Sequence, residues 1–194
     1  MKTLKTIGEL DADIKNLRVE VILNKEAKTI TIRDNGIGMT DKELDKYINQ
    51  IAFSGAEEFV NKYKDSDTKN PIIGHFGLGF YSAFMVAKEV EIITKSQKPN
   101  SKPVKWICDG SPNFTMEEAK KKTKGTDVIL HIADDSTEFL EEGRISTILN
   151  KYCKFLPVEI KFGTKTDKID DQKGKKDDKG NVIKIDKVSD NIIN

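Results

Sequence analysis

Two glycine-rich segments of this 194-residue sequence carry the residue types that bind small ligands. The first, Asp-Asn-Gly-Ile-Gly-Met, occupies residues 34–39. An Asn-Gly pair often forms a hairpin turn, but a hairpin needs a second strand directly afterwards. Here Thr40 and Glu43 have instead the spacing of a helix capping box. We therefore interpret the segment as a ligand loop, in which Gly36 and Gly38 let the backbone approach a flat ligand and Asp34 accepts a hydrogen bond from an amino group.

The second segment has the spacing Gly-x-x-Gly-x-Gly from Gly74 to Gly79 and precedes an apolar run. Free backbone N–H groups at the start of a helix form a natural binding site for phosphate. The spacing is not that of the dinucleotide fingerprint Gly-x-Gly-x-x-Gly. The lysine of a P-loop is also missing, since Phe80 follows the last glycine. The sequence thus predicts a phosphate-binding loop of neither common type.

The elements that must position these loops are predicted from the periodicity of apolar residues. Alternation predicts strands at 17–23, 29–32, 90–94, 104–108, 128–132 and 158–162. Helical spacing predicts helices at 41–52, 80–87 and 140–152, the second of them buried. This order favours an α+β two-layer sandwich with a mixed, largely antiparallel sheet and helices on one face.

The last thirty residues differ in composition from the rest. Half of residues 165–194 are Lys or Asp, and none is aromatic. The eight lysines and seven aspartates nearly cancel, which argues against a tail that binds a polyanion. We expect a solvated, charged linker after a domain formed by residues 1–164.

Charge and hydropathy exclude several classes of protein. Thirty-three Lys and Arg against 32 Asp and Glu give a net charge of +1, so no overall field favours nucleic acid or anionic lipid. No stretch approaches the roughly 20 apolar residues of a membrane-spanning helix, and the first residues lack the apolar core of a signal peptide. Cys108 and Cys153 have no His or Cys at metal-ligand spacing, which indicates reduced thiols. We expect a cytoplasmic protein.

Four motifs in order resemble the nucleotide-binding domain of HtpG-type heat-shock protein 90 chaperones, part of the GHKL ATPase superfamily that includes gyrase, MutL and sensor histidine kinases. The similarity runs from about Leu17 to Phe162. Its motifs are residues 34–39, Ile-Ala-Phe-Ser-Gly at 51–55, Ile73 to Phe84, and Gly125-Thr126. The resemblance implies a Bergerat fold in a stress-response chaperone that binds ATP or ADP with magnesium, hydrolyses ATP, binds unfolded client proteins and forms a homodimer.

The same resemblance assigns roles to residues. Asp34 would accept from the adenine amino group, Gly38 would allow the purine to approach, Met39 would pack on it, and Thr126 would support it through an ordered water. A lid would span about Thr40 to Ile73. The other nucleotide-binding residues implied are Gly36, Ser54, Gly55, Gly74, His75, Phe76, Gly77, Leu78, Gly79 and Phe80. His75 would order the phosphate loop rather than act as a base.

One departure from the family concerns catalysis. The family places a catalytic Glu and, one turn later, a magnesium-binding Asn on a helix upstream of the Asp loop. Only 33 residues precede Asp34 here. Glu20 and Asn24 have the one-turn spacing of the family's Glu and Asn but fall in the predicted hairpin. Glu9 is followed at the same spacing by Asp13 rather than by Asn. We therefore expect a domain truncated at its N-terminus, without the catalytic helix or a protein ligand for magnesium, that does not hydrolyse ATP alone. Two alternatives remain open: a nucleotide-independent interaction module on a vestigial GHKL fold, and another GHKL ATPase or kinase.

Overall fold

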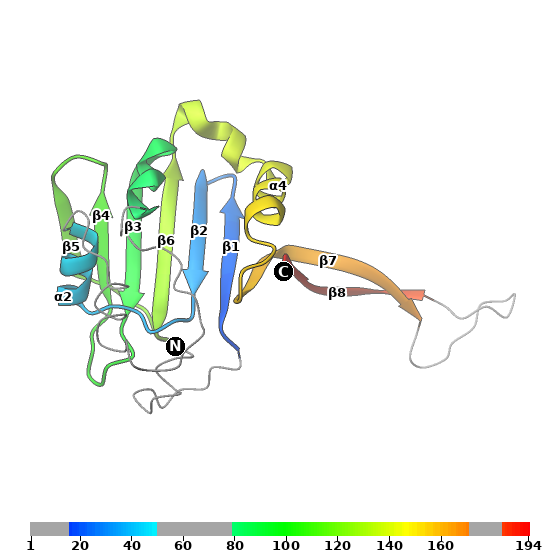
Figure 1. Cartoon of the computed structure of the whole chain (residues 1–194), viewed down its shortest axis with the longest axis horizontal. Helices are drawn as coiled ribbons and strands as arrows, with labels where there is room; N and C mark the ends of the chain where they lie inside the picture. Colours follow the sequence, from blue (N-terminus) through cyan, green and yellow to red (C-terminus); the bar gives the residue numbers. More distant parts are fainter. Residues whose placement is uncertain (1–15, 50–78, 171–183) are drawn as a thin grey trace, which may run out of the picture.

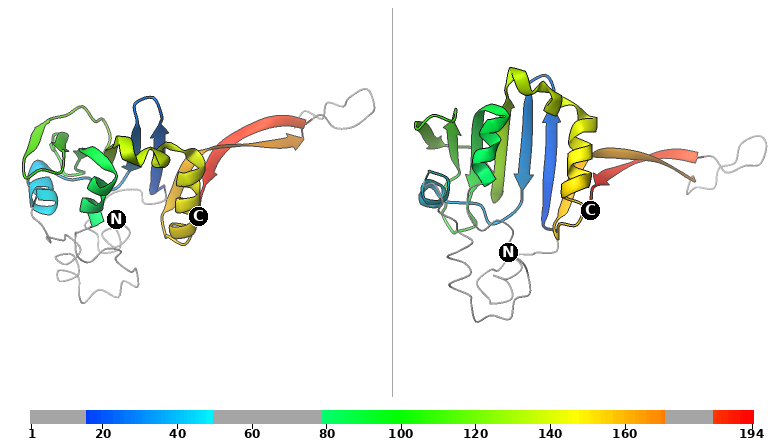
Figure 2. Two further views of the ribbon diagram at one scale, coloured as in Figure 1. Left: turned by 90° about the horizontal axis from the view of Figure 1, so that it is seen from above. Right: turned by 45° about the horizontal axis from the view of Figure 1, so that its top comes forward.

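The computed structural model describes residues 16–49, 79–170 and 184–194. These residues form one eight-stranded sheet with helical segments packed on one face (Figure 1; Figure 2). The strand order is β5-β4-β3-β6-β2-β1-β7-β8. Neighbouring strands are antiparallel except β1 and β7, which are parallel. The predicted fold class, a two-layer α+β sandwich with a mixed and mostly antiparallel sheet, is confirmed.

The boundaries of the elements follow the apolar alternation closely. The strands are β1 (Arg18–Asn24), β2 (Thr29–Asp34), β3 (Ala87–Lys95), β4 (Val104–Cys108), β5 (Phe114–Glu118), β6 (Gly125–Ile132), β7 (Glu159–Asp170) and β8 (Lys184–Ile192). The helical segments are α2 (Asp41–Leu44), a π-helical turn η1 (Asp45–Asn49), the 3₁₀ segments η2 (Gly79–Met85) and η3 (Asp134–Leu140), and α4 (Glu142–Tyr152). Of the strands, β5 and β8 were not predicted.

The core lies between the inner face of the sheet and the helical segments. Val90 and Ile92 of β3 and Ile132 of β6 are almost fully buried there. Trp106 of β4 packs edge-on against Phe80 of η2, with 5.6 Å between ring centroids. The helix predicted at 80–87 is thus present as 3₁₀ helix, but it is half-buried rather than buried, because only one of its sides meets the sheet. Met85, on its other side, is 81% exposed.

The outer face of the sheet carries the alternate, polar set of strand residues. Ion pairs link neighbouring strands across this face: Arg33 Nε lies 3.1 Å from Asp127 Oδ1, and Lys161 Nζ lies 2.7 Å from Glu20 Oε1. Opposite charges on adjacent strands stabilise pairing while leaving this face compatible with water. The described helices, for their part, are all too short or too polar to cross a lipid bilayer.

The charged C-terminal region differs from the predicted linker, because much of it is β-structure. β7 continues to Asp170 and pairs with β8, and this hairpin extends away from the body of the sheet (Figure 1). Its register sets Asp167 opposite Lys187 and Lys168 opposite Asp186. Cross-strand pairs of opposite charge stabilise a hairpin, and composition alone does not reveal them. Residues 165–170 and 184–192 are thus strand, while the role of this segment as a charged linker and the domain boundary near 164 stay predictions.

Candidate functional site

Asp34 ends β2 and holds its carboxylate in a partly buried position. Its Oδ1 accepts a hydrogen bond from the backbone N–H of Gly36 at 2.7 Å. Burial raises the pKa of this carboxyl above 3.8, and hydrogen bonds from the backbone N–H groups of Gly36 and Thr126 and the charge of Lys121 oppose that rise in part. A carboxylate withdrawn from water is a strong acceptor for a ligand N–H group.

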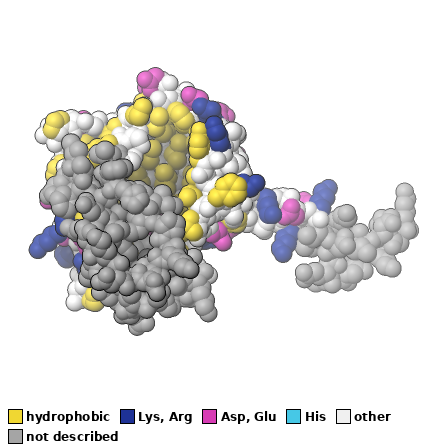
Figure 3. Space-filling view, viewed as in Figure 1, with side chains coloured by type: hydrophobic (Ala, Val, Ile, Leu, Met, Phe, Trp, Pro, Cys, Tyr) yellow, Lys and Arg dark blue, Asp and Glu magenta, His cyan; other side chains and the backbone are white. Residues whose placement is uncertain are grey.

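An apolar surface adjoins this carboxylate. Ile32 lies two residues before Asp34 on β2, so the two side chains share one face of the sheet. The side chain of Ile32 is 41% exposed although it points to the inner face, and Ile37 of the loop is 40% exposed. Figure 3 shows apolar side chains gathered in a hollow on the face of the sheet seen in Figure 1. A flat apolar surface beside a single strong acceptor suits a planar ring with an amino group.

The loop after Asp34 is fixed to the end of β3. Gly38 has φ +62°, and a Cβ at this position would lie 1.9 Å from the carbonyl oxygen of Lys95. The loop crosses the end of β3 so closely at this position that only glycine fits. On either side of the crossing, Gln97 N–H donates to Ile37 O at 2.7 Å and Met39 N–H donates to Thr94 Oγ1 at 2.9 Å.

Two buried threonine hydroxyls lie behind the loop. Thr94 Oγ1 and Thr126 Oγ1 are 3.0 Å apart, and both residues are buried. Thr94 was not among the predicted site residues. The signal for it was a hydroxyl at an inward position of a strand, in alternation with Val90 and Ile92, where a third apolar residue is expected.

The Gly125-Thr126 motif meets the Asp34 loop at the start of β6. Gly125 has φ +116°, and a Cβ there would lie 2.2 Å from the carbonyl oxygen of Asp34. Two motifs that are about ninety residues apart in the sequence thus come into direct backbone contact. The structure brings together five of the predicted residues: Asp34, Gly36, Gly38, Met39 and Thr126.

The remaining predicted residues have other positions. Phe80, at the start of η2, packs its ring against Trp106 and Phe84 in the core rather than pointing to the loop at Asp34. Gly79 precedes it in the same segment. The others, Ser54, Gly55, Gly74, His75, Phe76, Gly77 and Leu78, lie outside the described residues, as does most of the predicted lid.

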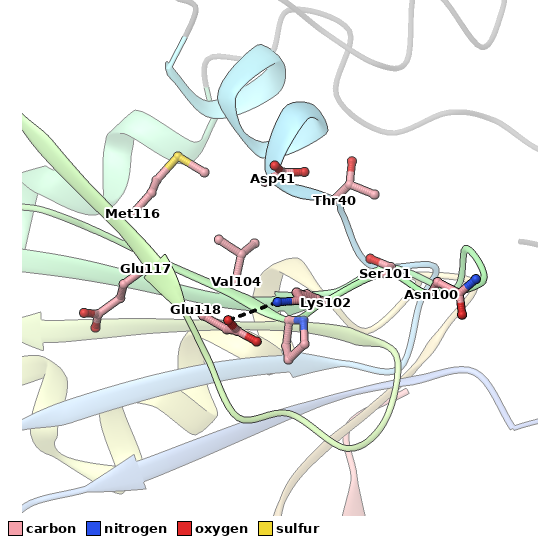
Figure 4. A pocket seen from close by; sticks show the side chains of 10 residues that line it. Thr40, Asp41, Asn100, Ser101, Lys102, Val104, Met116, Glu117 and Glu118 are labelled. Atoms are coloured by element: carbon pink, nitrogen blue, oxygen red, sulfur yellow. Dashed lines mark hydrogen bonds and ion pairs between the residues drawn. The ribbon is translucent and has the colours of Figure 1, made fainter.

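The helix that follows the loop begins as predicted. Thr40 Oγ1 accepts from Glu43 N–H at 3.3 Å, and Glu43 Oε2 accepts from Thr40 N–H at 2.9 Å, which completes the capping box. Beside this helix start is a hollow of about 500 Å³ that Thr40 and Asp41 line together with residues 100–104 and 116–118 (Figure 4). Asp34 and Thr126 do not line it, so it is separate from the site at Asp34.

Glu20 and Asn24, which imitate the family's catalytic spacing, lie on β1 rather than on a helix. Glu20 Oε1 forms an ion pair with Lys161 on the outer face, and Asn24 Oδ1 accepts from Ala27 N–H at 2.9 Å in the turn to β2. Neither side chain is directed to the site at Asp34, so the interpretation of this pair as part of a hairpin is confirmed. Glu9 and Asp13 lie outside the described residues.

A family model described as "Histidine kinase-, DNA gyrase B-, and HSP90-like ATPase" matches residues 9–134, more than half of the chain. The chain belongs to this family.

Within the family the similarity extends to chaperones named HtpG. The chain is 61% identical over 165 residues to "Chaperone protein HtpG" of Bacteroides fragilis, an alignment that covers 85% of this chain and 24% of the relative. Identity is 56% over 194 residues with HtpG of Bacteroides thetaiotaomicron (100% and 26%) and 40% over 157 residues with that of Idiomarina loihiensis (80% and 25%). The resemblance to the HtpG nucleotide-binding domain is confirmed, and the chain spans about a quarter of the length of these relatives.

Proposed function

We propose that this chain binds ATP or ADP as the nucleotide-binding domain of an HtpG-type chaperone. The observation that carries the proposal is the partly buried carboxylate of Asp34 beside the exposed face of Ile32. Adenine presents an amino donor to a carboxylate at this position, whereas guanine presents a carbonyl oxygen at the same ring carbon and two acceptors would face each other. The site therefore favours adenine nucleotides over guanine nucleotides.

The described residues fit the base of the nucleotide. Asp34 would orient the purine through its amino group, Gly38 and Met39 would lie along its plane, and the hydroxyl of Thr126 would hold a water between the base and the sheet. The phosphate-binding role proposed for Gly74 to Phe80 rests on their spacing and on the family. Bound magnesium would supply positive charge to the phosphates, and neither Glu20 nor Asn24 is available to bind it.

For the whole protein we infer the role that the family suggests. ATP-driven motions of a lid and of neighbouring domains would assist the folding of unfolded client proteins in a cytoplasmic, stress-induced homodimer. The chain spans about a quarter of the length of these relatives, so these features are proposed for the whole protein.

Titration of the purified chain with a fluorescent adenine nucleotide tests the proposed function. We expect saturable binding that unlabelled ATP and ADP reverse and that GTP does not. A nucleotide-independent interaction module, the alternative function, predicts no saturable binding. Equal competition by GTP would contradict the role of Asp34 as acceptor for an adenine amino group.

We further propose that the 194-residue chain by itself does not hydrolyse ATP. Hydrolysis needs a base that orients and deprotonates water beside the terminal phosphate, and such a base contributes about 10² to 10⁴-fold. The carboxylate of Glu20 is instead paired with Lys161 on the outer face of the sheet. Phosphate release should equal the background, with or without magnesium, and Glu20→Gln should not change it. Magnesium-dependent release above background, removed by Glu20→Gln, would show that this argument fails.

A further inference from the structure

The outer face of the sheet carries three side chains with metal-binding atoms, on the side opposite to Asp34. Glu89 and Glu91 lie two residues apart on β3 and so project to the same face. His131 of β6 stands directly opposite Glu89 in the strand register. Its Nε2 lies 2.6 Å from Glu91 Oε1 and 3.7 Å from Glu89 Oε1, and one ligand atom from each residue lies within 4.8 Å of the others.

We propose that Glu89, Glu91 and His131 form a binding site for a divalent transition-metal ion, with Zn²⁺ as the matching ion. One imidazole nitrogen and two carboxylate oxygens are a donor set that Zn²⁺ accepts, with a fourth position left for water. Ligand atoms about 2.0 to 2.2 Å from a tetrahedral ion are about 3.3 to 3.6 Å apart. The two separations from His131 Nε2, 2.6 and 3.7 Å, bracket these values, and the two carboxylate oxygens lie within 4.8 Å of each other, so small side-chain rotations on two paired strands complete the site.

Lys105 of β4 supports this arrangement from the neighbouring strand. Its Nζ lies 3.0 Å from Glu91 Oε2, the oxygen that does not face His131, so it orients the carboxylate and leaves Oε1 toward the proposed ion. With the imidazole neutral, two carboxylates and one ammonium give the cluster a net charge of −1, which favours a cation. The partial exposure of Glu89, whose side chain is 43% exposed, leaves a path for the ion to enter.

The test is calorimetric titration of the chelator-treated, tag-free chain with Zn²⁺. We expect saturable binding of one ion, loss of affinity by at least about tenfold in His131→Gln and in Glu91→Gln, and no displacement by excess Mg²⁺. Glu117→Gln is the matched control, because Glu117 is an exposed outer-face glutamate 3.8 Å from Lys105 and outside the proposed ligand set.

Thermal unfolding gives a second readout that does not depend on heats of binding. Zn²⁺ should raise the melting temperature of the wild type and of Glu117→Gln, but not that of a folded His131→Gln chain. Glu89→Gln, the change at the most exposed ligand, should weaken binding even if the other two variants are poorly folded. The proposal is overturned if the wild type shows no saturable binding, or if all three ligand variants bind as the wild type does. Because the cluster and Asp34 lie on opposite faces, neither result bears on nucleotide binding.

Discussion

Asp34→Asn should weaken adenine-nucleotide binding by about fivefold to a hundredfold while the chain stays folded. The asparagine Oδ1 can still accept from Gly36 N–H, as the carboxylate does at 2.7 Å. The position of the other carboxylate oxygen then holds an NH₂ group, so two hydrogen-bond donors, this group and the adenine amino group, face each other. Losing the charged acceptor and leaving the adenine amino group unpaired costs about 1 to 3 kcal/mol of binding free energy. Nucleotide titration of the variant and the wild type measures the difference, and identical curves would refute the role of Asp34.

The same substitution should change the pH dependence of stability. Burial raises the folded-state pKa of Asp34 above 3.8, so between the unfolded and folded values the folded chain binds more protons than the unfolded chain. The free energy of unfolding therefore falls as pH rises through that window, and the ionised carboxylate is unfavourable above it. Asparagine carries no such charge. The asparagine oxygen accepts from only one of the two backbone N–H groups that bond the carboxylate, so this gain is opposed by one lost hydrogen bond of about 1 kcal/mol. Denaturant unfolding should show that the stability of the variant relative to the wild type rises from acidic to neutral pH.

Asp127→Asn is the matched control for this prediction. Asp127 follows Thr126 on β6 but points to the outer face, where it pairs with Lys121 Nζ at 2.7 Å and Arg33 Nε at 3.1 Å. Removing its charge leaves two cations without their partner, so stability should fall while nucleotide binding remains. A loss of binding in both variants would point to general damage to the sheet rather than to recognition by Asp34.

Much of the fold follows from local sequence signals, because one face of each inner strand is buried. Alternation located β1, β2, β3, β4 and β6, and the Thr-x-x-Glu spacing located the start of α2. β5 has no such signal, since only Met116 of its five residues is partly buried. It is an edge strand defined by its pairing with β4, and pairing between distant segments is not a local property.

The site was predictable where backbone geometry demands a residue type and not where the strand register brings side chains together. Gly38 and Gly125 are visible in the sequence because their crossings exclude any Cβ. Thr94 shows in the sequence only as a hydroxyl at an inward strand position, and its role depends on β3 lying beside β6 with Thr94 opposite Thr126. The pairing of Glu91 with His131, forty residues away, likewise depends on that register.

Gly38→Ala should have the largest effect on the loop itself. Alanine at φ +62° is strained by about 1 to 3 kcal/mol, and its Cβ would overlap the Lys95 carbonyl oxygen at 1.9 Å. The Lys95 carbonyl is backbone and the position of a Cβ is fixed by its own backbone, so no side-chain rotation relieves the overlap. The loop must lift from β3 and break the Gln97–Ile37 and Met39–Thr94 hydrogen bonds. Unfolding experiments should show a loss of at least about 2 kcal/mol, and nucleotide titration should show little or no binding.

Gly143→Ala is the control, and its expected effect on stability has the opposite sign. Gly143 lies in α4, and a Cβ there meets no atom within 4 Å. Alanine is favoured over glycine inside a helix by about 1 kcal/mol and by less in the first turn, where Gly143 lies, so this variant should be slightly more stable than the wild type and bind nucleotide equally well. Since both variants add one methyl group in place of a glycine hydrogen, their difference isolates the backbone crossing at Gly38. If Gly38→Ala unfolds at the same denaturant concentration as the wild type and keeps its affinity, the loop does not need the crossing, and its fixed position cannot be what presents Asp34 and Met39 to the nucleotide.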